Sequence, residues 1–322
     1  MPAVVTHSVF ATQMLKRYSL KETIPNLMEE EFLLGSQGPD IFFFCRMFPW
    51  QKGKGLYKFG SVLHVDKPSA LFFEMSRICR DKKQQYYSEV LSYCLGMCCH
   101  YCLDRAAHPY VNYSVEKMDA LRKRGRAFKY HAEIESMLDV IVLRDIDRKL
   151  MSEISLPDCI PLGEHTGEAV AQLYIRLLKV LYSVELPQKT ANLLVPDFRY
   201  AMGILNDPCR VKRPLAAAVE RLLISPRILG DRLTAGSASA YLRPLSEELD
   251  YDYANTSHSR WHNPAQREES SNESFFEIFE RAMSDAESLI LQFLRAANGE
   301  DVDFAALTEE RTFSYGAAYR SE

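Results

Sequence analysis

The sequence predicts an all-α protein. Apolar residues recur at the 3.6-residue period of a helix from one end of the 322-residue chain to the other. Segments with the strict alternation typical of half-buried strands are scarce. No fixed-period internal repeat of the kind that marks a helical solenoid is visible. We therefore expect helices packed on helices around one or two cores.

Composition excludes several classes of protein. Hydrophobic residues make up 47% and charged residues 25%, which is ordinary for a soluble globular chain. The net charge of −4 gives no general attraction to phosphate backbones, so we expect no nucleic-acid partner. No apolar stretch reaches the roughly 18 residues that a membrane span needs. The N-terminus lacks a basic stretch followed by an apolar one, so a cytoplasmic location is expected.

The first quarter of the chain predicts three helices and two loops. Residues 3–18 are periodic and contain His7, and a shorter helix over 26–34 ends at Gly35. The stretch GSQGPDIFFF then predicts a turn with Asp40 at its exit, followed by an aromatic run that we assign to core packing. The alternative is that the part of this run next to Asp40 walls a substrate pocket.

A surface loop is expected at residues 45–60, and the segment 61–66 that follows it carries His64. Pro68 suits the first position of a helix that runs to about Cys79.

The stretch Tyr87–Tyr110 is mostly apolar, yet it carries three metal-binding residue types. His100 and Asp104 are four residues apart, so they lie one turn apart on one helix face, and His108 continues the row. Unpaired polar groups in a core are costly, so these side chains need a partner. Pro109 indicates that this helix is ending.

A second pair repeats this spacing. His131 and Glu135 are four residues apart on a predicted helix that follows a basic loop at 122–126 and runs to about Leu150. We interpret the two helices as facing each other and holding zinc. Asp139 lies further along the same stripe, where a hydrogen-bond or salt-bridge role is expected.

The rest of the chain shows helices without a comparable set, because His258 and His262 lie four apart in a polar segment that we interpret as a solvated loop. We divide the chain into a zinc-binding helical core over 1–155 and additional helices over 156–322, packed on the same domain. A polar segment over 236–269 has Trp261 as its core anchor, and the tail from Thr308 is expected to be weakly ordered. The helices predicted in this part cover 164–184, a segment ending near 206, 213–224 and 273–297.

The cysteines are expected to be buried and reduced. Four of the eight, from Cys94 to Cys102, crowd the apolar helix, where they resemble small hydrophobes. Cys98 and Cys99 point to different faces, so the four cannot converge on one metal.

Eight residues form the candidate metal set. Histidine nitrogen and carboxylate oxygen are ligands of zinc, and a helical pair four residues apart supplies two ligands at once. From this set two or three sites can be built. In chain order the residues are His7, Asp40, His64, His100, Asp104, His108, His131 and Glu135.

Over roughly residues 1–150, the order and spacing of this set resembles the zinc-dependent phospholipase C family of bacteria. The matching motifs are GPD with Asp40, a lone His64, HYCLD, His108, and HAEIE. The resemblance implies a multi-helix bundle of the phospholipase C and nuclease type that encloses a metal cluster. Exported members of the family have a signal peptide, and toxin members have a β-sandwich lipid-binding domain; neither is visible here.

The resemblance also implies a role for each residue. The first zinc would be held by Asp40, His64 and the pair His100 and Asp104. A third zinc, which the family completes with a processed N-terminus, would use His7 with Asp104. Asp40 would also be the general base. The second zinc would be held by His108, His131 and Glu135.

These roles predict a metal-dependent phosphodiester hydrolase in which metal-activated water attacks a small phosphoester or phospholipid head group. Three alternatives remain open, of which the last is the weakest. A single-strand nuclease of the related fold uses a similar cluster, although its last helical pair ends in Asp where this chain has Glu135. A non-catalytic helical protein would use zinc only to hold its fold, and a di-iron bundle would need more glutamates.

Overall fold

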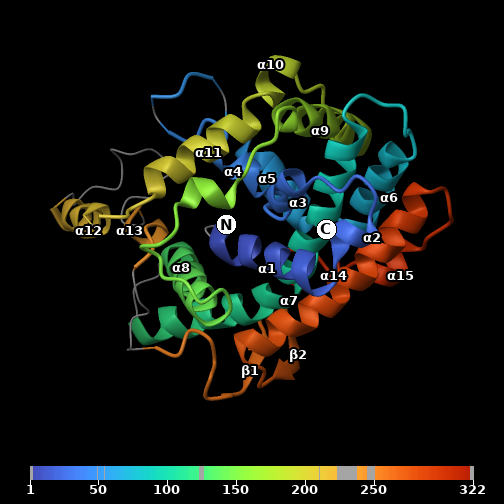
Figure 1. The fold of residues 1–322 in the computed structure, drawn as a ribbon. Coiled ribbons are helices and arrows are strands. Elements are labelled where there is room, and N and C mark those ends of the chain that lie inside the picture. The colour runs from blue at the N-terminus through green and yellow to red at the C-terminus, as the bar shows by residue number, and fades with distance from the viewer. Residues whose placement is uncertain are drawn as a thin grey trace.

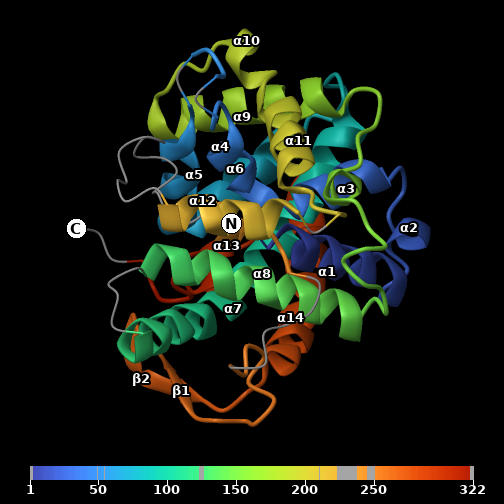
Figure 2. The same cartoon turned by 90° about the vertical axis from the view of Figure 1, so that its left-hand side faces the viewer.

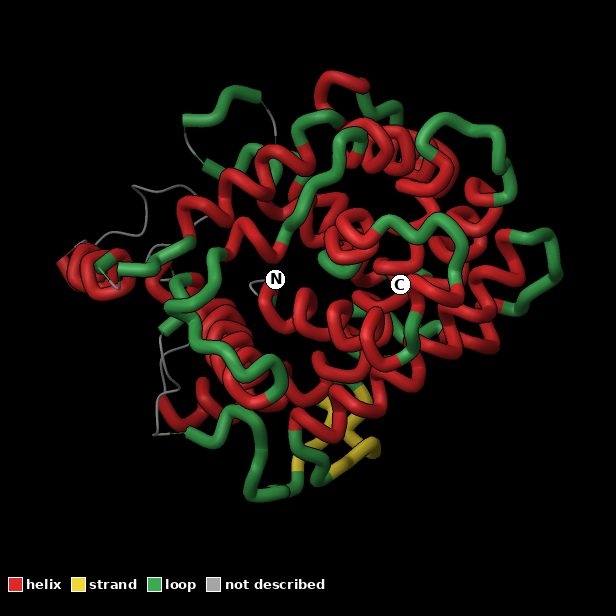
Figure 3. Tube along the Cα trace, viewed as in Figure 1, coloured by secondary structure: helices red, strands yellow, loops and turns green. Residues whose placement is uncertain are grey.

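Helices make up nearly all of the regular structure in the described part of the chain (Figure 3). The computed structural model describes residues 3–48, 50–53, 55–122, 127–209, 211–222, 238–244 and 251–319. Strands are limited there to the antiparallel pair β1 (Trp261–Asn263) and β2 (Gln266–Ser271), in which Trp261 lies opposite Ser271. The all-α prediction is therefore confirmed.

The long helix α7 (Tyr87–Arg122) is the element on which the others are assembled (Figure 1). Two helices contact it most extensively, α3 (Glu29–Gly35) and α14 (Phe275–Ala297). The helix α8 (Ala127–Asp145) packs on α7 and on α1 (Val4–Arg17). Figure 2 shows α8 running beside α7.

The remaining helices surround this core. In Figure 1, α9, α10 and α11 lie together at the top, and α14 runs along the lower right. Their bounds are α2 (Leu20–Thr23), η1 (Gly38–Asp40), α4 (Ile41–Phe44), α5 (Tyr57–Val65), α6 (Pro68–Cys79), η2 (Leu156–Cys159), α9 (Thr166–Tyr182), α10 (Gln188–Ala191), α11 (Leu194–Leu205), α12 (Lys212–Leu222), α13 (Ala238–Tyr241) and α15 (Phe304–Thr308).

The prediction that α7 ends near Pro109 is wrong, because the helix continues to Arg122. Proline has no N–H, so the carbonyl of Arg105, four residues earlier, loses its helical partner. Gly316 packs against this carbonyl, so closely that a Cβ atom at Gly316 would lie 2.2 Å from the Arg105 oxygen. Tertiary packing along α7 therefore outweighs the local cost of the proline.

The expectation of a weakly ordered tail from Thr308 is also wrong. Thr308 and Phe313 have 0% exposure, and Arg311 pairs with Glu269 at 2.7 Å. The sequence of the tail has no helical periodicity. It therefore gives no sign that segments distant in the sequence bury the tail.

Two smaller differences concern loops. The predicted loop over 45–60 ends earlier, because α5 begins at Tyr57 and carries His64 near its end. Of the basic loop predicted at 122–126, residues 123–126 lie outside the described residues. Trp261 is 6% exposed and donates a hydrogen bond from Nε1 to the Glu273 carbonyl, as an anchor should.

Candidate metal centre

Five elements bring the eight predicted donors together. His7 comes from α1, Asp40 ends η1, and His64 comes from α5. The remaining donors come from α7 and α8, three from α7 and two from α8. The eight side chains form three groups whose ligand atoms lie within 4.8 Å of one another: His7 with His100 and Asp104, Asp40 with His64 and His100, and His108 with His131 and Glu135.

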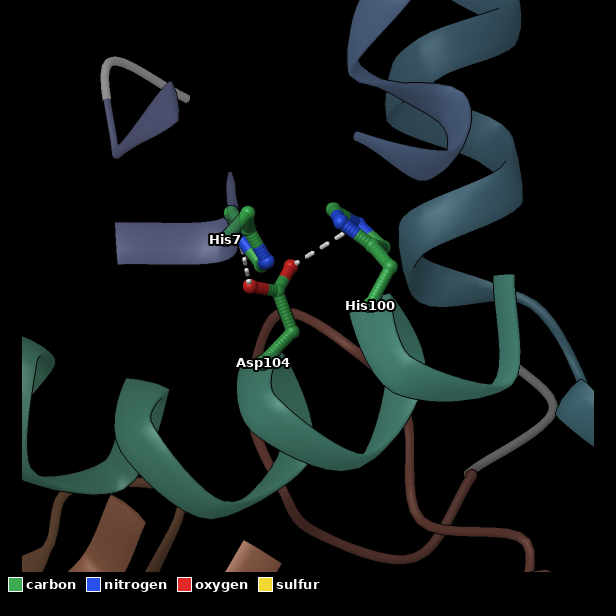
Figure 4. A group of neighbouring side chains, drawn as sticks. All are labelled: His7, His100 and Asp104. Carbon is green, nitrogen blue, oxygen red and sulfur yellow. Dashed lines mark ion pairs between the residues drawn. The ribbon is translucent and has the colours of Figure 1, made fainter. Parts of the chain in front are cut away.

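Asp104 lies at the junction of these groups. Its Oδ1 is 3.1 Å from His7 Nε2, and its Oδ2 is 3.3 Å from His100 Nε2 (Figure 4). The two carboxylate oxygens therefore face imidazoles from two different helices. Oδ2 also lies 3.6 Å from His64 Nε2 and 3.6 Å from His108 Nδ1.

The second group joins the η1 turn to α5 and α7. His64 Nε2 is 3.1 Å from Asp40 Oδ1 and 3.4 Å from His100 Nε2. Gly38 begins the turn with a φ of +52°, and its carbonyl accepts a hydrogen bond from Tyr93 Oη at 3.0 Å. The GPD motif thus works as a rigid turn that presents a carboxylate to two histidines.

The third group joins α7 to α8. Glu135 Oε1 is 3.1 Å from His131 Nε2, one helical turn away, and 3.6 Å from His108 Nε2 on the facing helix. The rings of His108 and His131 stack with centroids 5.6 Å apart. The two helices therefore face each other through these side chains, as predicted.

Three of the histidines are oriented by main-chain oxygens. The Nδ1 atom of His64 lies 2.7 Å from the Gly60 carbonyl, and that of His100 lies 3.0 Å from the Ser36 carbonyl. The Nδ1 atom of His108 lies 2.7 Å from the carbonyl of Phe313. With Nδ1–H donating outward, each Nε2 points into the centre, and in the neutral ring it offers its lone pair there, the usual arrangement around a metal-binding histidine.

Burial and charge act in different directions on the pKa values of the centre. Burial lowers the pKa of His100 to about 3, so its ring is neutral at physiological pH. For His108, burial also lowers the pKa, but the carboxylates of Asp104 and Glu135 outweigh it and raise the pKa to about 9. Burial acts to raise the pKa of Asp104, but the charged His108 ring beside it outweighs this effect and holds that pKa well below its usual range.

The donor set suits zinc. Zinc takes imidazole nitrogen and carboxylate oxygen, and each of the three groups offers both. The buried Nδ1 of His7 has no hydrogen-bond partner within the described part of the chain, and an unpaired buried donor or acceptor is costly. Cysteine belongs to none of the three groups, and the four thiols from Cys94 to Cys102 are buried and free, as predicted.

Asp139 has the supporting role that was expected of it. Its Oδ1 accepts hydrogen bonds from the main-chain N and the Oγ1 of Thr6, both at 2.7 Å. Its Oδ2 pairs with Arg243 Nε at 2.7 Å. Because Thr6 precedes His7, this carboxylate ties the start of α1 to α8 next to the centre.

Several contributors to the site were missed in the sequence. The carbonyls of Gly60, Ser36 and Phe313 have no residue-type signature, since every residue carries one. Gly38 of the GPD motif was a usable sequence signal, because a glycine allows another side chain, here His100, to approach the backbone closely. Phe43 was not missed, because it belongs to the aromatic run for which a pocket wall was considered, and its ring lies 5.3 Å from that of His64 and 4.9 Å from that of the half-exposed Tyr57.

The protein is therefore a helical protein whose buried histidine and carboxylate groups form a candidate metal centre. The model of the family described as zinc dependent phospholipase C matches residues 6–182, and the chain belongs to this family. The match ends where α9 ends and covers all eight donors.

No curated protein and no solved structure matches the chain. Within the described residues, none of the helices combines the length and the apolar composition needed to cross a bilayer.

Proposed function

We propose that this protein is a zinc-dependent phosphodiester hydrolase of the phospholipase C type. The observation that carries the proposal is the adjacency of the three donor groups. Two of them share His100, and Asp104 of one lies 3.6 Å from His108 of another. Adjacent metal ions are suited to phosphodiesters, because they can stabilise charge on the attacking and the leaving oxygen.

The proposed assignment of ligands follows the groups. Asp40, His64, His100 and Asp104 would hold one zinc, and His7 with Asp104 would contribute to another. His108, His131 and Glu135 would hold the zinc between α7 and α8. When bound, zinc would supply Lewis acidity and lower the pKa of a water molecule.

Asp40 is the proposed general base. It is 4% exposed, and its Oδ1 lies 3.1 Å from His64 Nε2, so its carboxylate is held in a fixed position inside the centre. A carboxylate fixed in this way would orient the attacking water and accept its proton. The nucleophile would then be water, with no covalent intermediate on the protein.

The substrate would approach from the side of His131. The His131 side chain is 25% exposed, whereas those of the other seven donors are 10% exposed or less. A buried centre with one accessible edge suits a phosphodiester of a small alcohol or a phospholipid head group better than a long polymer.

The experiment is a comparison of metal content with turnover. Wild-type protein should contain zinc and hydrolyse a glycerophosphodiester, and chelation should abolish this activity until zinc is restored. Asp40→Asn, assayed with added zinc because Asp40 is also a proposed ligand, should lose about 10²- to 10⁴-fold in turnover, the usual range for a general base.

The alternatives give different results in the same assay. If zinc only holds the fold, the loaded protein hydrolyses no phosphoester. If the protein is a nuclease, it cleaves single-stranded DNA faster than the glycerophosphodiester. Full activity after chelation, or in Asp40→Asn, would contradict the proposed mechanism.

A further inference from the structure

The C-terminal segment (residues 309–319) lies against the candidate metal centre, although the family match ends at residue 182. Phe313 is at its middle and is completely buried. Its main-chain oxygen lies 2.7 Å from His108 Nδ1. A residue more than 200 positions away in the sequence therefore sets the orientation of a candidate zinc ligand.

The side chain of Phe313 contacts the other groups of the centre. Its ring centroid is 5.5 Å from that of His64 and 5.8 Å from that of His100. The main-chain N–H of the next residue, Ser314, donates to the His64 carbonyl at 3.1 Å. The segment thus touches three of the five candidate histidine ligands, on α5 and on α7.

The segment is fixed to α7 and to the β-hairpin. Asn112 donates from Nδ2 to the Ser314 carbonyl at 2.9 Å, and Gly316 packs against the carbonyl that Pro109 leaves without a helical partner. Arg311 pairs with Glu269 on β2 and donates to the Gly316 carbonyl at 2.8 Å. These contacts fix the position of Phe313 along the axis of α7.

The hydrogen bond from His108 has a chemical consequence. When Nδ1–H donates to a carbonyl, the ring is held in the tautomer that leaves Nε2 free. That Nε2 atom lies 3.6 Å from Glu135 Oε1, within the third donor group. Without the carbonyl, the ring could rotate toward Asp104, whose Oδ2 lies 3.6 Å from Nδ1.

We propose that the C-terminal segment is a positioning element of the metal centre. The Phe313 carbonyl orients the His108 ring, and the Phe313 ring packs against His64 and His100. The close packing of Gly316 on α7 fixes the position of Phe313 along that helix. This inference rests on the metal binding in the proposed function and is independent of the reaction catalysed.

The test uses a matched pair of glycines in the full-length protein. Gly316 and Gly299 both have positive φ angles, of 52° and 98°. A Cβ atom at Gly316 would meet the Arg105 carbonyl, whereas one at Gly299 would meet nothing within 4 Å. Both replacements by alanine strain the backbone, but only Gly316→Ala displaces the segment from α7.

Zinc affinity is measured by competition with a chromophoric chelator, and thermal midpoints are measured with and without zinc. We expect Gly316→Ala to weaken zinc binding at one or more sites about 10- to 100-fold, the usual effect of losing a partner that orients a ligand. Gly299→Ala should bind zinc like the wild type. Phe313→Leu, which keeps the carbonyl and replaces the aromatic ring with a smaller aliphatic side chain, should also weaken binding.

A purely structural role gives another result. The variants would then lower the midpoint of the zinc-free and zinc-loaded protein equally, with wild-type zinc affinity, and the inference would be overturned. If Gly316→Ala does not fold, Phe313→Leu decides between the two outcomes. Wild-type protein that binds zinc without hydrolysing a diester contradicts the proposed reaction only, whereas wild-type protein that binds no zinc contradicts both proposals.

Discussion

The imidazole of His100 fills the space beside Gly38 in which any other residue would carry its Cβ atom. A Cβ atom built at Gly38 would lie 2.3 Å from His100 Cδ2 and 2.8 Å from its Nε2. Two tyrosines hold the turn in place, because the hydroxyls of Tyr93 and Tyr174 both donate to the Gly38 carbonyl. The turn that presents Asp40 and the ring that faces it are therefore packed as one unit.

Gly38→Ala should disrupt this unit. The φ of +52° costs an L-residue about 1 kcal/mol, and overpacking typically costs a further 1–3 kcal/mol. We expect a loss of about 2–4 kcal/mol in the free energy of unfolding, together with lower zinc content because His100 must move. Urea unfolding and elemental analysis of the purified variant measure the two effects.

Gly203→Ala is the control for this substitution. Gly203 lies in α11, and a Cβ atom there would meet nothing within 4 Å. Alanine in an exposed helix is favoured over glycine by roughly 0.5–1 kcal/mol, so this variant should be as stable as the wild type or more stable. Equal behaviour of the two variants would contradict the close packing of Gly38 on His100.

Asp104→Asn should remove more zinc than Glu135→Gln. Asp104 faces four histidines, whereas Glu135 faces only two, His108 and His131. An amide cannot supply the negative charge that an ion between these rings requires, and its NH₂ group competes as a donor. We expect Glu135→Gln to lose the ion of its own group and Asp104→Asn to lose at least one more. Elemental analysis after dialysis against a weak chelator measures the content, and wild-type zinc in both variants would contradict this ligand assignment.

Much of the fold could be predicted because it is encoded locally. The predicted helix over 68–79 coincides with α6, and the one over 273–297 differs from α14 by two residues at its start. The candidate donors could be grouped for the same reason, because pairs such as His100 and Asp104 share one helix face whatever the tertiary structure is.

What could not be predicted depends on contacts between distant segments. Pro109 is a local signal for a helix end, but the packing along α7 that outweighs it comes from α14 and from residues near 316. The burial of Phe313 likewise has no local pattern, and its role toward His108 is carried by a main-chain atom. Candidate side-chain ligands can be seen in a sequence, but the carbonyls that orient them cannot.

Cys209 should be the one thiol that reacts rapidly in the native protein. It is the only exposed cysteine among the eight, all of which lie in the described part of the chain. Burial raises the pKa of Cys45, Cys102 and Cys159 to about 12, which lowers their thiolate fraction as well as their access. A chromogenic disulfide reagent should report one fast thiol in buffer and eight in urea. Cys209→Ser should abolish the fast reaction, and rapid reaction of several thiols in buffer would contradict the burial of the remaining seven.

The pair of Asp139 and Arg243 is buried on both sides, with side-chain exposures of 0% and 2%. Burial raises the pKa of Asp139, although Arg243 and Thr6 oppose it by stabilising the charged carboxylate. Removing one member of a buried pair leaves an uncompensated charge and typically costs about 3–5 kcal/mol. We expect Arg243→Met to destabilise the protein by an amount of this order at pH 7, measured by urea unfolding.

The pH dependence of this loss tests its cause. Without Arg243, the folded-state pKa of Asp139 should rise further above its unfolded value. A carboxyl with a raised folded pKa contributes full stability below its unfolded pKa and loses that contribution as pH rises through the folded pKa. The destabilisation by Arg243→Met should therefore be smaller at pH 5 than at pH 7, and adding Asp139→Asn should restore part of the stability at pH 7. An unpaired carboxylate becomes protonated as the pH falls, so its cost should shrink. If Arg243→Met loses the same stability at both pH values, Arg243 contributes by packing instead.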